Sequence, residues 1–299
     1  MKATQTRPSG TLAVSRPQPR MGMRTARLLH QILVYALLIG LGIVFILPFM
    51  WMVSTSLKQS QDVFTFPPHF LPTSFEWRNY ITGWTRLPFT TFLQNSLIVT
   101  AANVVGNLLS CSLVAYGFAR LRARGRDLLF LLLLGTLMIP REVTIVPTFI
   151  LFTRLHLVNT LWPLILPAWF GYPFFIFLLR QFFMSLPHEL DEAARIDGAS
   201  SFRIFTNIIL PLSKPALGTV AIFSFIGNWN NLLDPLIYLR STEKFTLALG
   251  LSLFQGEHVT QYNELMAVSI IQILPILILF FLAQKYFVRG VALSGMGGR

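Results

Sequence analysis

The sequence predicts an all-α, polytopic membrane protein with six transmembrane helices and a helix-turn-helix loop on the cytoplasmic side. Of its 299 residues, 54% are hydrophobic and only 12% are charged, and its mean hydropathy is +0.61. A soluble domain carries about 25% charged residues to cover its surface, so lipid is the expected solvent. Apolar stretches of spanning length and an uneven distribution of Lys and Arg point the same way.

Six stretches supply roughly the 20 apolar residues that a spanning helix needs. They are residues 31–53, 92–119, 128–152, 160–179, 215–239 and 265–284. The third stretch contains Pro140. A helix that ended at Pro140 would be too short to cross, so we expect a kinked helix that continues toward Pro147.

The Lys and Arg residues predict the orientation, because cytoplasmic loops carry an excess of them. With the N-terminus in the cytoplasm, six lie in the N-terminal tail, four in the stretch ARLRARGRD, four around the loop between the fourth and fifth spans, and three at the C-terminus. Six others fall outside, and Arg141 lies within a span. This pattern places both termini in the cytoplasm. It also explains the net charge of +12 without nucleic acid as a partner.

The same pass along the chain predicts its organisation. We expect a basic, disordered cytoplasmic tail at 1–28, a six-helix transmembrane domain at 29–290, and a Gly-rich cytoplasmic tail at 291–299. The helix-turn-helix loop occupies about 183–213 of that domain. An external segment at 58–88, rich in Pro and aromatic residues, suits a compact interfacial loop. We expect Trp77 and Tyr80 of this segment at headgroup level.

The stretch ELDEAARIDGASSFRIFTNIILP, between the fourth and fifth spans, is the one densely charged segment inside the apolar chain. Acids in its first turn complement the positive end of a helix dipole. Gly198 suits the left-handed residue just past a helix end. Ser200 or Ser201 can then cap a second helix at 202–209, which Pro211 would end.

The first of these two helices has a smooth face formed by Leu190, Ala193, Ala194 and Asp197, at positions i, i+3, i+4 and i+7. Such a face suits a groove on a partner protein. An amphipathic helix resting on lipid headgroups is the alternative. A membrane-resting helix favours Lys and Arg, whereas this one has four acids against Arg195 alone.

The loop also carries a spaced motif: Glu192-Ala193-Ala194, three residues, Gly198, nine residues, and Ile208-x-Leu210-Pro211. This motif resembles the cytoplasmic EAA loop of the permeases of ATP-binding-cassette importers. The stretches YGFARLRARGRD, MIPREVTIVPTFILFTRLHLVNT, NWNNLLDPLIYL, FTLALGL and QKYFVRGVALSGMGG are similar to the MalG-like branch for carbohydrates. The resemblance covers nearly everything after about residue 30. Asp234 departs from it, because relatives often carry an aromatic or apolar residue there.

The resemblance implies a multi-pass permease subunit in a bacterial inner membrane. It implies a second, homologous permease in a heterodimer, two cytoplasmic ATPase subunits that hold ATP and Mg²⁺, and an external solute-binding protein. It further implies that the loop docks into an ATPase, with the coupling residues being Glu192, Ala193, Ala194, Asp197 and Gly198. The solute would be a sugar or a related molecule. The C-terminal tail either reaches the ATPases or is plainly disordered.

The sequence contains no recognisable motif for nucleotide hydrolysis or zinc binding. No phosphate-binding G-x-x-x-x-G-K-[ST] loop is present, so ATP hydrolysis is expected in separate subunits. HELDE, at His188, lacks the second His of a H-E-x-x-H zinc site, and the five His residues are scattered. We therefore expect no catalytic, cofactor-binding or metal site in this chain.

Polar residues inside spans are candidates for the translocation pathway. Glu142 lies in the third span, where it either lines the pathway or forms a structural ion pair with Arg141 or a partner subunit. Asn228, Asn231 and Asp234 recur at i, i+3 and i+6 on the fifth span and would form one stripe. Their amides suit sugar hydroxyls, but they equally suit hydrogen bonds between helices.

Two function classes remain. The first is the permease subunit of an ATP-driven importer. The alternative is a secondary transporter or channel without an ATPase partner, which would need a carboxylate cluster near the membrane centre, where only Glu142 is available. A membrane-embedded hydrolase is disfavoured because no catalytic set is present.

Overall fold

The structure, a computed structural model, describes residues 21–255 and 261–295. It consists of two units, which are treated separately: residues 1–51 and residues 52–299. The described part of the first unit is helix α1 (Met21–Ser56) up to Trp51. The predicted tail at 1–28 lies outside the described residues as far as residue 20, and from Met21 the chain is helical.

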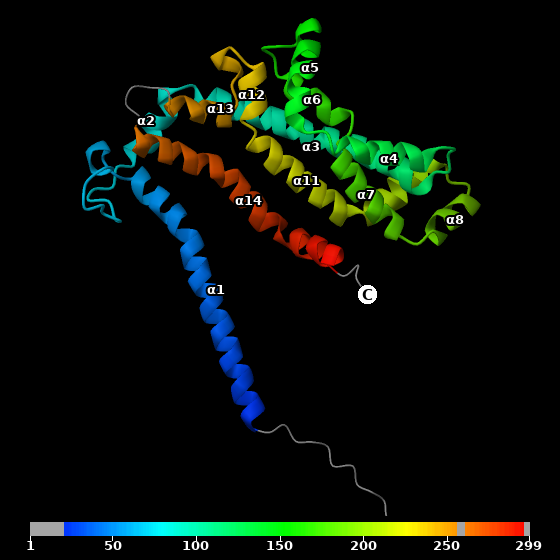
Figure 1. Ribbon diagram of the computed structural model, residues 1–299, viewed down its shortest axis with the longest axis horizontal. Helices are drawn as coiled ribbons and strands as arrows, with labels where there is room; N and C mark the ends of the chain where they lie inside the picture. Colours follow the sequence, from blue (N-terminus) through cyan, green and yellow to red (C-terminus); the bar gives the residue numbers. More distant parts are fainter. Residues whose placement is uncertain (1–20, 256–260, 296–299) are drawn as a thin grey trace, which may run out of the picture. The chain divides into compact units, whose positions relative to one another are not determined.

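The described part of the second unit contains helices and no strands (Figure 1). Its longer helices are α2 (Arg78–Arg86), α3 (Phe89–Arg120), α4 (Arg126–Thr136), α5 (Arg141–Arg154), α6 (Trp162–Trp169), α7 (Pro173–Ser185), α8 (Glu189–Ile196), α11 (Lys214–Trp229) and α14 (Tyr262–Gly295). Its shorter elements are η1 (Ser60–Asp62), α9 (Ser201–Ile204), η2 (Phe205–Ile209), α10 (Leu210–Leu212), α12 (Leu233–Tyr238), η3 (Thr242–Lys244), α13 (Leu247–Ser252) and η4 (Leu253–Gln255).

Helices long and apolar enough to cross a membrane lie at four of the six predicted spans, namely the first, second, fourth and sixth. Among the described residues, four helical segments are long and apolar enough to cross a membrane by themselves: Arg27–Ser56, Phe89–Arg120, Trp162–Ser185 and Tyr262–Gln284. Two bent pairs bring the number to six if each pair forms one span: Arg126–Thr136 with Arg141–Arg154, and Ser201–Leu212 with Lys214–Trp229. The all-α, polytopic fold class is therefore confirmed.

Helix α3 is the central element of the second unit and packs against α6, α7 and α11 (Figure 1). Its buried face carries polar side chains that bond to neighbouring helices. The Asn103 amide donates to the Leu164 carbonyl over 2.9 Å, and the Asn107 amide lies 2.9 Å from the Ser224 hydroxyl. Small and polar residues of this kind hold helices together where lipid offers no hydrophobic drive.

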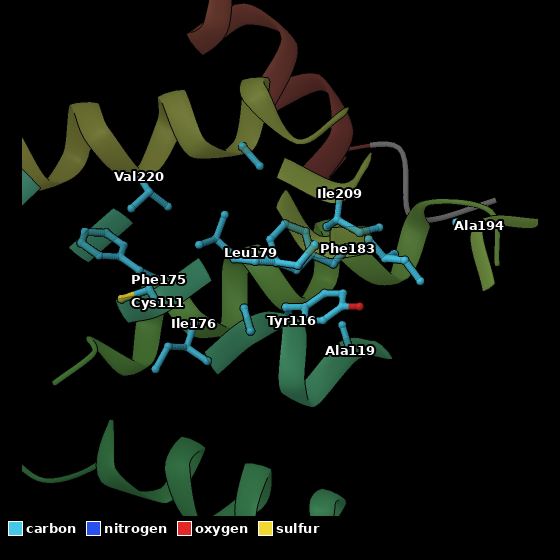
Figure 2. Close-up of a cluster of buried hydrophobic side chains, with 14 residues drawn as sticks. Cys111, Tyr116, Ala119, Phe175, Ile176, Leu179, Phe183, Ala194, Ile209 and Val220 are labelled. Carbon is cyan, nitrogen blue, oxygen red and sulfur yellow. The ribbon is translucent and has the colours of Figure 1, made fainter. Parts of the chain in front are cut away.

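Near the Arg120 end of α3 lies a cluster of buried apolar side chains from α3, α7, α8, the segment 201–212 and α11 (Figure 2). Tyr116, Leu179 and Phe183 meet Ile209 there, while Val220 of α11 lies at the other side. A second cluster, at the Phe89 end of α3, contains Phe89, Phe92, Trp229, Leu247 and Val268. The two clusters fix the second unit at both ends of its longest buried helix.

The third predicted span is not a kinked continuous helix, so that expectation is wrong. Helix α4 ends at Thr136, α5 begins at Arg141, and their axes differ by 97°. Pro140 adopts an extended backbone conformation at the start of α5. Proline has no N–H and clashes with the preceding turn, which suits a helix start better than a helix interior.

The fifth predicted span is also interrupted. Helix α11 ends at Trp229 and α12 begins at Leu233, so the expected stripe of Asn228, Asn231 and Asp234 does not lie on one helix. Asn231 instead accepts the backbone N–H of Asp234 at its Oδ1 over 3.2 Å. Asparagine competes for backbone groups in this way, and this favours helix ends over helix interiors.

The loop that follows α1 packs against the start of α14. The Asn79 amide donates to the carbonyls of Ser56 and Lys58, and Asn263 donates to Asn79 over 3.0 Å. Tyr80 is turned toward Ser56, with 2.9 Å between the hydroxyls, whereas Trp77 is exposed.

At the other end of the chain, α14 continues to Gly295, and residues 296–299 of the predicted C-terminal tail lie outside the described residues.

Candidate functional site

The polar segment between the fourth and fifth spans folds as a helical hairpin, residues 189–212, called the hairpin below. Its first helix, α8, ends with Gly198 in the left-handed conformation at φ +79°. The Gly198 N–H bonds to the Arg195 carbonyl over 3.0 Å, and the Ala199 N–H bonds to the Ala194 carbonyl over 2.9 Å. This pair of bonds satisfies the last carbonyls of α8, and the positive φ explains why glycine occupies this position.

The second arm begins where the sequence predicts. Ser200 accepts the backbone N–H of Arg203 at its Oγ over 3.3 Å, so the serine caps the helix. The chain stays helical through Leu212, with a π-helical stretch at Phe205–Ile209. Pro211 therefore does not end the arm. The end comes after Leu212, where the axis bends by 78° into α11.

One side of the hairpin packs against its own chain. Ala194 of α8 and Ile209 of the second arm join the buried cluster with Phe183 (Figure 2). The sequence analysis placed Ala194 on the docking face, and the structure buries it instead, with 8% of its surface exposed. Ala194 therefore packs against the chain's own core and is not part of the free face of α8.

The other side of the hairpin is open. Glu192, Ala193 and Asp197 are exposed, as is Gly198 in the turn. Two large apolar side chains accompany them, Ile196 with 87% and Phe202 with 67% of their surface exposed. The sequence analysis did not single out either residue, although an isoleucine and a phenylalanine beside acidic positions are the available signal. Apolar side chains exposed beside acidic ones suit contact with a partner protein or with lipid headgroups.

A buried ion pair joins the hairpin to α3, and it too was missed from the sequence. The Arg120 guanidinium lies 3.3 Å from the Asp191 carboxylate, and their side chains are 0% and 6% exposed. Arg120 appeared in the sequence only as one of four basic residues on a loop, and Asp191 as one of three acids in a first turn. Because 71 residues separate them, no local pattern could have paired them.

A second polar group lies where both bent spans are interrupted. Arg141, at the start of α5, forms an ion pair with Asp234 of α12. The Asn231 amide donates to the same carboxylate over 2.6 Å. These three residues, Arg141, Asn231 and Asp234, are called the polar cluster below. Farther along the same two helices, the hydroxyls of Thr148 and Tyr238 are 3.0 Å apart.

The remaining pathway candidates lie apart from the polar cluster. Asn228 donates its amide to the Ser224 carbonyl of its own helix over 2.7 Å, so it does not join Asn231 and Asp234. Glu142 is exposed, and among the described residues its carboxylate forms no ion pair. Arg141 therefore pairs with Asp234 rather than with Glu142.

Metal ligands do not come together in the part of the chain that the structure describes. No group of three or more His, Cys, Asp or Glu residues within residues 21–255 and 261–295 could hold a metal ion. The single cysteine, Cys111, is buried, and the backbone N–H of Tyr172 points at its sulfur over 3.2 Å.

Comparisons with known proteins give one consistent result. The family described as "binding-protein-dependent transport system inner membrane component" matches residues 20–293. The probable ABC transporter permease protein YurM of Bacillus subtilis is 37% identical over 252 residues, covering 84% of this chain and 83% of the relative. The arabinooligosaccharides transport system permease protein AraQ of Halalkalibacterium halodurans is 40% identical over 230 residues, covering 77% and 82% of the two chains.

Two further matches add a relative named for a different solute and a solved structure. The sn-glycerol-3-phosphate transport system permease protein UgpE of Pectobacterium atrosepticum is 38% identical over 240 residues, which is 78% of this chain and 85% of the relative. The crystal structure of a bacterial ABC transporter that imports the acidic polysaccharide alginate matches with a TM-score of 0.78. That match covers 91% of this chain and 100% of the solved one at 24% identity, which supports the fold.

Proposed function

The chain belongs to the family of binding-protein-dependent transport system inner membrane components, and on that basis we propose how its hairpin and polar cluster serve transport. It is a multi-pass permease subunit of an importer that works with a solute-binding protein. The resemblance to ATP-binding-cassette importer permeases is thereby confirmed. The proposal concerns the solute, the driving subunits and the residues that connect them.

The hairpin is the proposed docking site for a separate cytoplasmic ATPase that holds ATP and Mg²⁺. One observation carries this proposal: α8 is packed against its own chain on one side, while Glu192, Ala193, Ile196 and Asp197 remain exposed on the other. A short helix with apolar groups and acids on its free side suits a groove on a partner. Two such ATPases would then drive a pair of permeases.

The second permease is proposed as a homologous subunit that covers the bend between α4 and α5. Backbone groups that leave a helix inside a membrane must be satisfied by protein or by a water-filled cavity, because lipid cannot bond to them. Met138 in this bend is 84% exposed in the isolated chain. A heterodimer would cover this region and place the translocation pathway between its subunits.

The solute is proposed to be a sugar or a similar polar molecule. Relatives named for arabinooligosaccharides and for sn-glycerol-3-phosphate support this class without selecting one solute. Glu142 and the polar cluster are the residues of this chain proposed to face the pathway, because they gather polar groups at two helix interruptions. Asn228, bonded along its own helix, contributes less directly.

The orientation also belongs to this proposal. The hairpin and both termini lie in the cytoplasm of a bacterial cell, as the distribution of Lys and Arg indicates. We also propose that the transmembrane domain, which includes the hairpin, extends from residue 29 to residue 290 between two cytoplasmic tails.

The test is to isolate the chain from its native membrane in mild detergent and to ask whether an ATPase subunit is isolated with it. We expect the ATPase to accompany the wild-type chain and to be lost from Glu192→Lys, because the reversed charge lies on the free side of α8. Asp127→Lys is the control, since Asp127 is an exposed carboxylate on the same predicted side but outside the hairpin. Undiminished solute uptake with no ATPase present would favour the secondary transporter or channel instead.

A further inference from the structure

We propose that Arg120 is a positioning residue that holds α8 rigidly to α3 and α7, so that movement of the hairpin becomes movement of the membrane helices. The inference rests on the proposed function of the hairpin as the docking site for an ATPase. It adds what that proposal lacks, namely the connection between the docked helix and the transport pathway.

The guanidinium of Arg120 joins three elements at once. Its Nη2 donates to the carbonyls of Phe183 and Leu186, over 2.6 and 2.7 Å, at the end of α7. Its Nη1 lies 3.0 Å from Nδ1 of His188 and 3.3 Å from Oδ2 of Asp191. The last carbonyls of a helix have no partner within the helix, so the arginine of α3 caps α7 and binds α8 together.

The pair is poorly suited to be a source of stability alone. Both side chains are buried, yet within the described residues Nε of Arg120 and Oδ1 of Asp191 have no hydrogen-bond partner. Incompletely satisfied buried ion pairs are often no better for stability than apolar residues of the same size. The planar fork of arginine instead fixes the relative orientation of the groups that it joins, which neither an apolar side chain nor lysine would do.

Helix α8 has few other attachments. It is eight residues long, and only Asp191 and Ala194 among its side chains are buried. Ala194 contributes one methyl group, and the turn at Gly198 follows directly. A force on the exposed side of α8 therefore reaches α3 through Asp191 and Arg120, in addition to the chain that joins α8 to α7 at residues 186–188.

The experiment uses the complete transporter in proteoliposomes, with its partner permease, ATPases and solute-binding protein. Arg120→Gln and Asp191→Asn are compared with the wild type and with Arg122→Gln, which removes an exposed arginine two residues away. The quantity measured is solute transported per ATP hydrolysed. We expect both variants to assemble and hydrolyse ATP while this ratio falls by about fivefold or more, the scale of a typical coupling between sites. Arg122→Gln should keep the wild-type ratio.

A purely structural role would reduce the amount of complex and leave the ratio unchanged, and that result overturns the inference. If Arg120→Gln assembles poorly, a second measurement on Asp191→Asn still tests the inference. Spin labels at Glu189→Cys on α8, which lies outside the proposed docking face, and at Gly117→Cys on α3 report the distance between the helices, with Cys111→Ser as background. We expect a narrow distance distribution in the wild type and a broad one in Asp191→Asn. Equal widths overturn the inference, whereas uptake without any ATPase in the wild type would overturn the proposed function itself.

Discussion

At the scale of single residues, packing around Gly250 leaves no room for a side chain. A Cβ atom at this position of α13 would lie 2.2 Å from Cδ2 of Phe92, which is fully buried. Gly250 therefore allows α13 to approach α3 closely. The stretch FTLALGL owes its glycine to this approach, because the backbone of Gly250 has no positive φ that would require one.

We expect Gly250→Ala to destabilise the protein by about 1–3 kcal/mol, the usual cost of forcing an extra carbon into a packed core. The midpoint of thermal unfolding in detergent measures it. Gly117→Ala is the control, because a Cβ on Gly117 meets nothing within 4 Å and alanine is the better helix former. A Gly250→Ala protein as stable as the wild type would show that Phe92 moves aside freely.

The ion pair of the polar cluster is only partly buried, with side chains 55% exposed at Arg141 and 24% at Asp234. We expect Arg141→Ala and Asp234→Ala to change stability by about 1 kcal/mol or less, as partly exposed pairs do. Both should reduce solute uptake, and the double variant should lose less than the two single losses combined. Arg154→Ala, at the other end of α5, is the control. Independent, fully additive losses would contradict a functional pair.

At the scale of elements, the hairpin depends on one residue with a left-handed backbone. Replacing Gly198 with valine forces a branched side chain into φ +79°, at a cost of roughly 1–2 kcal/mol. Asparagine tolerates this region, so Gly198→Asn should retain the ATPase on copurification and Gly198→Val should lose it. The same outcome for both variants would mean that the turn conformation is not what matters.

The hairpin could be predicted from the sequence because its signals are local. A glycine past a helix end and a serine before the next helix act within a few residues, and both lie where expected. The interruptions at 137–140 and 230–232 could not be predicted in this way. A proline within an apolar stretch, such as Pro140, is compatible with a kink or a break, and the ion pair that accompanies the break joins Arg141 to the distant Asp234.

At the scale of the whole molecule, hydropathy predicts six spans but not which polar groups meet. Arg120 and Asp191 belong to different spans and loops, and the fold alone brings them together. For the same reason, hydropathy could not predict that Asp234 and Asn228, both candidates for the pathway, have different partners. Asp234 meets Arg141 across two interruptions, and Asn228 bonds to its own helix.

The bend between α4 and α5 gives a prediction about assembly. In Met138→Cys, we expect a thiol reagent to modify the isolated chain and to be excluded once the second permease is bound, because the bend needs a protein cover. Met138 has 84% of its surface exposed in the isolated chain. The control is Leu71→Cys on the loop after α1, where 72% of the leucine surface is exposed, and this cysteine should react in both states. Equal modification of Met138→Cys with and without the partner would show that the partner binds elsewhere.

The wide sequence separation within the Arg120 contacts has a consequence for biosynthesis. The guanidinium leaves the ribosome 63 residues before the carbonyl of Phe183 and 71 residues before Asp191. At 5–20 residues per second, this delay lasts roughly 3–14 seconds. During that time the nascent second span carries a cation whose counterpart has not been made, and water, headgroups or the insertion machinery must solvate it until translation reaches the hairpin.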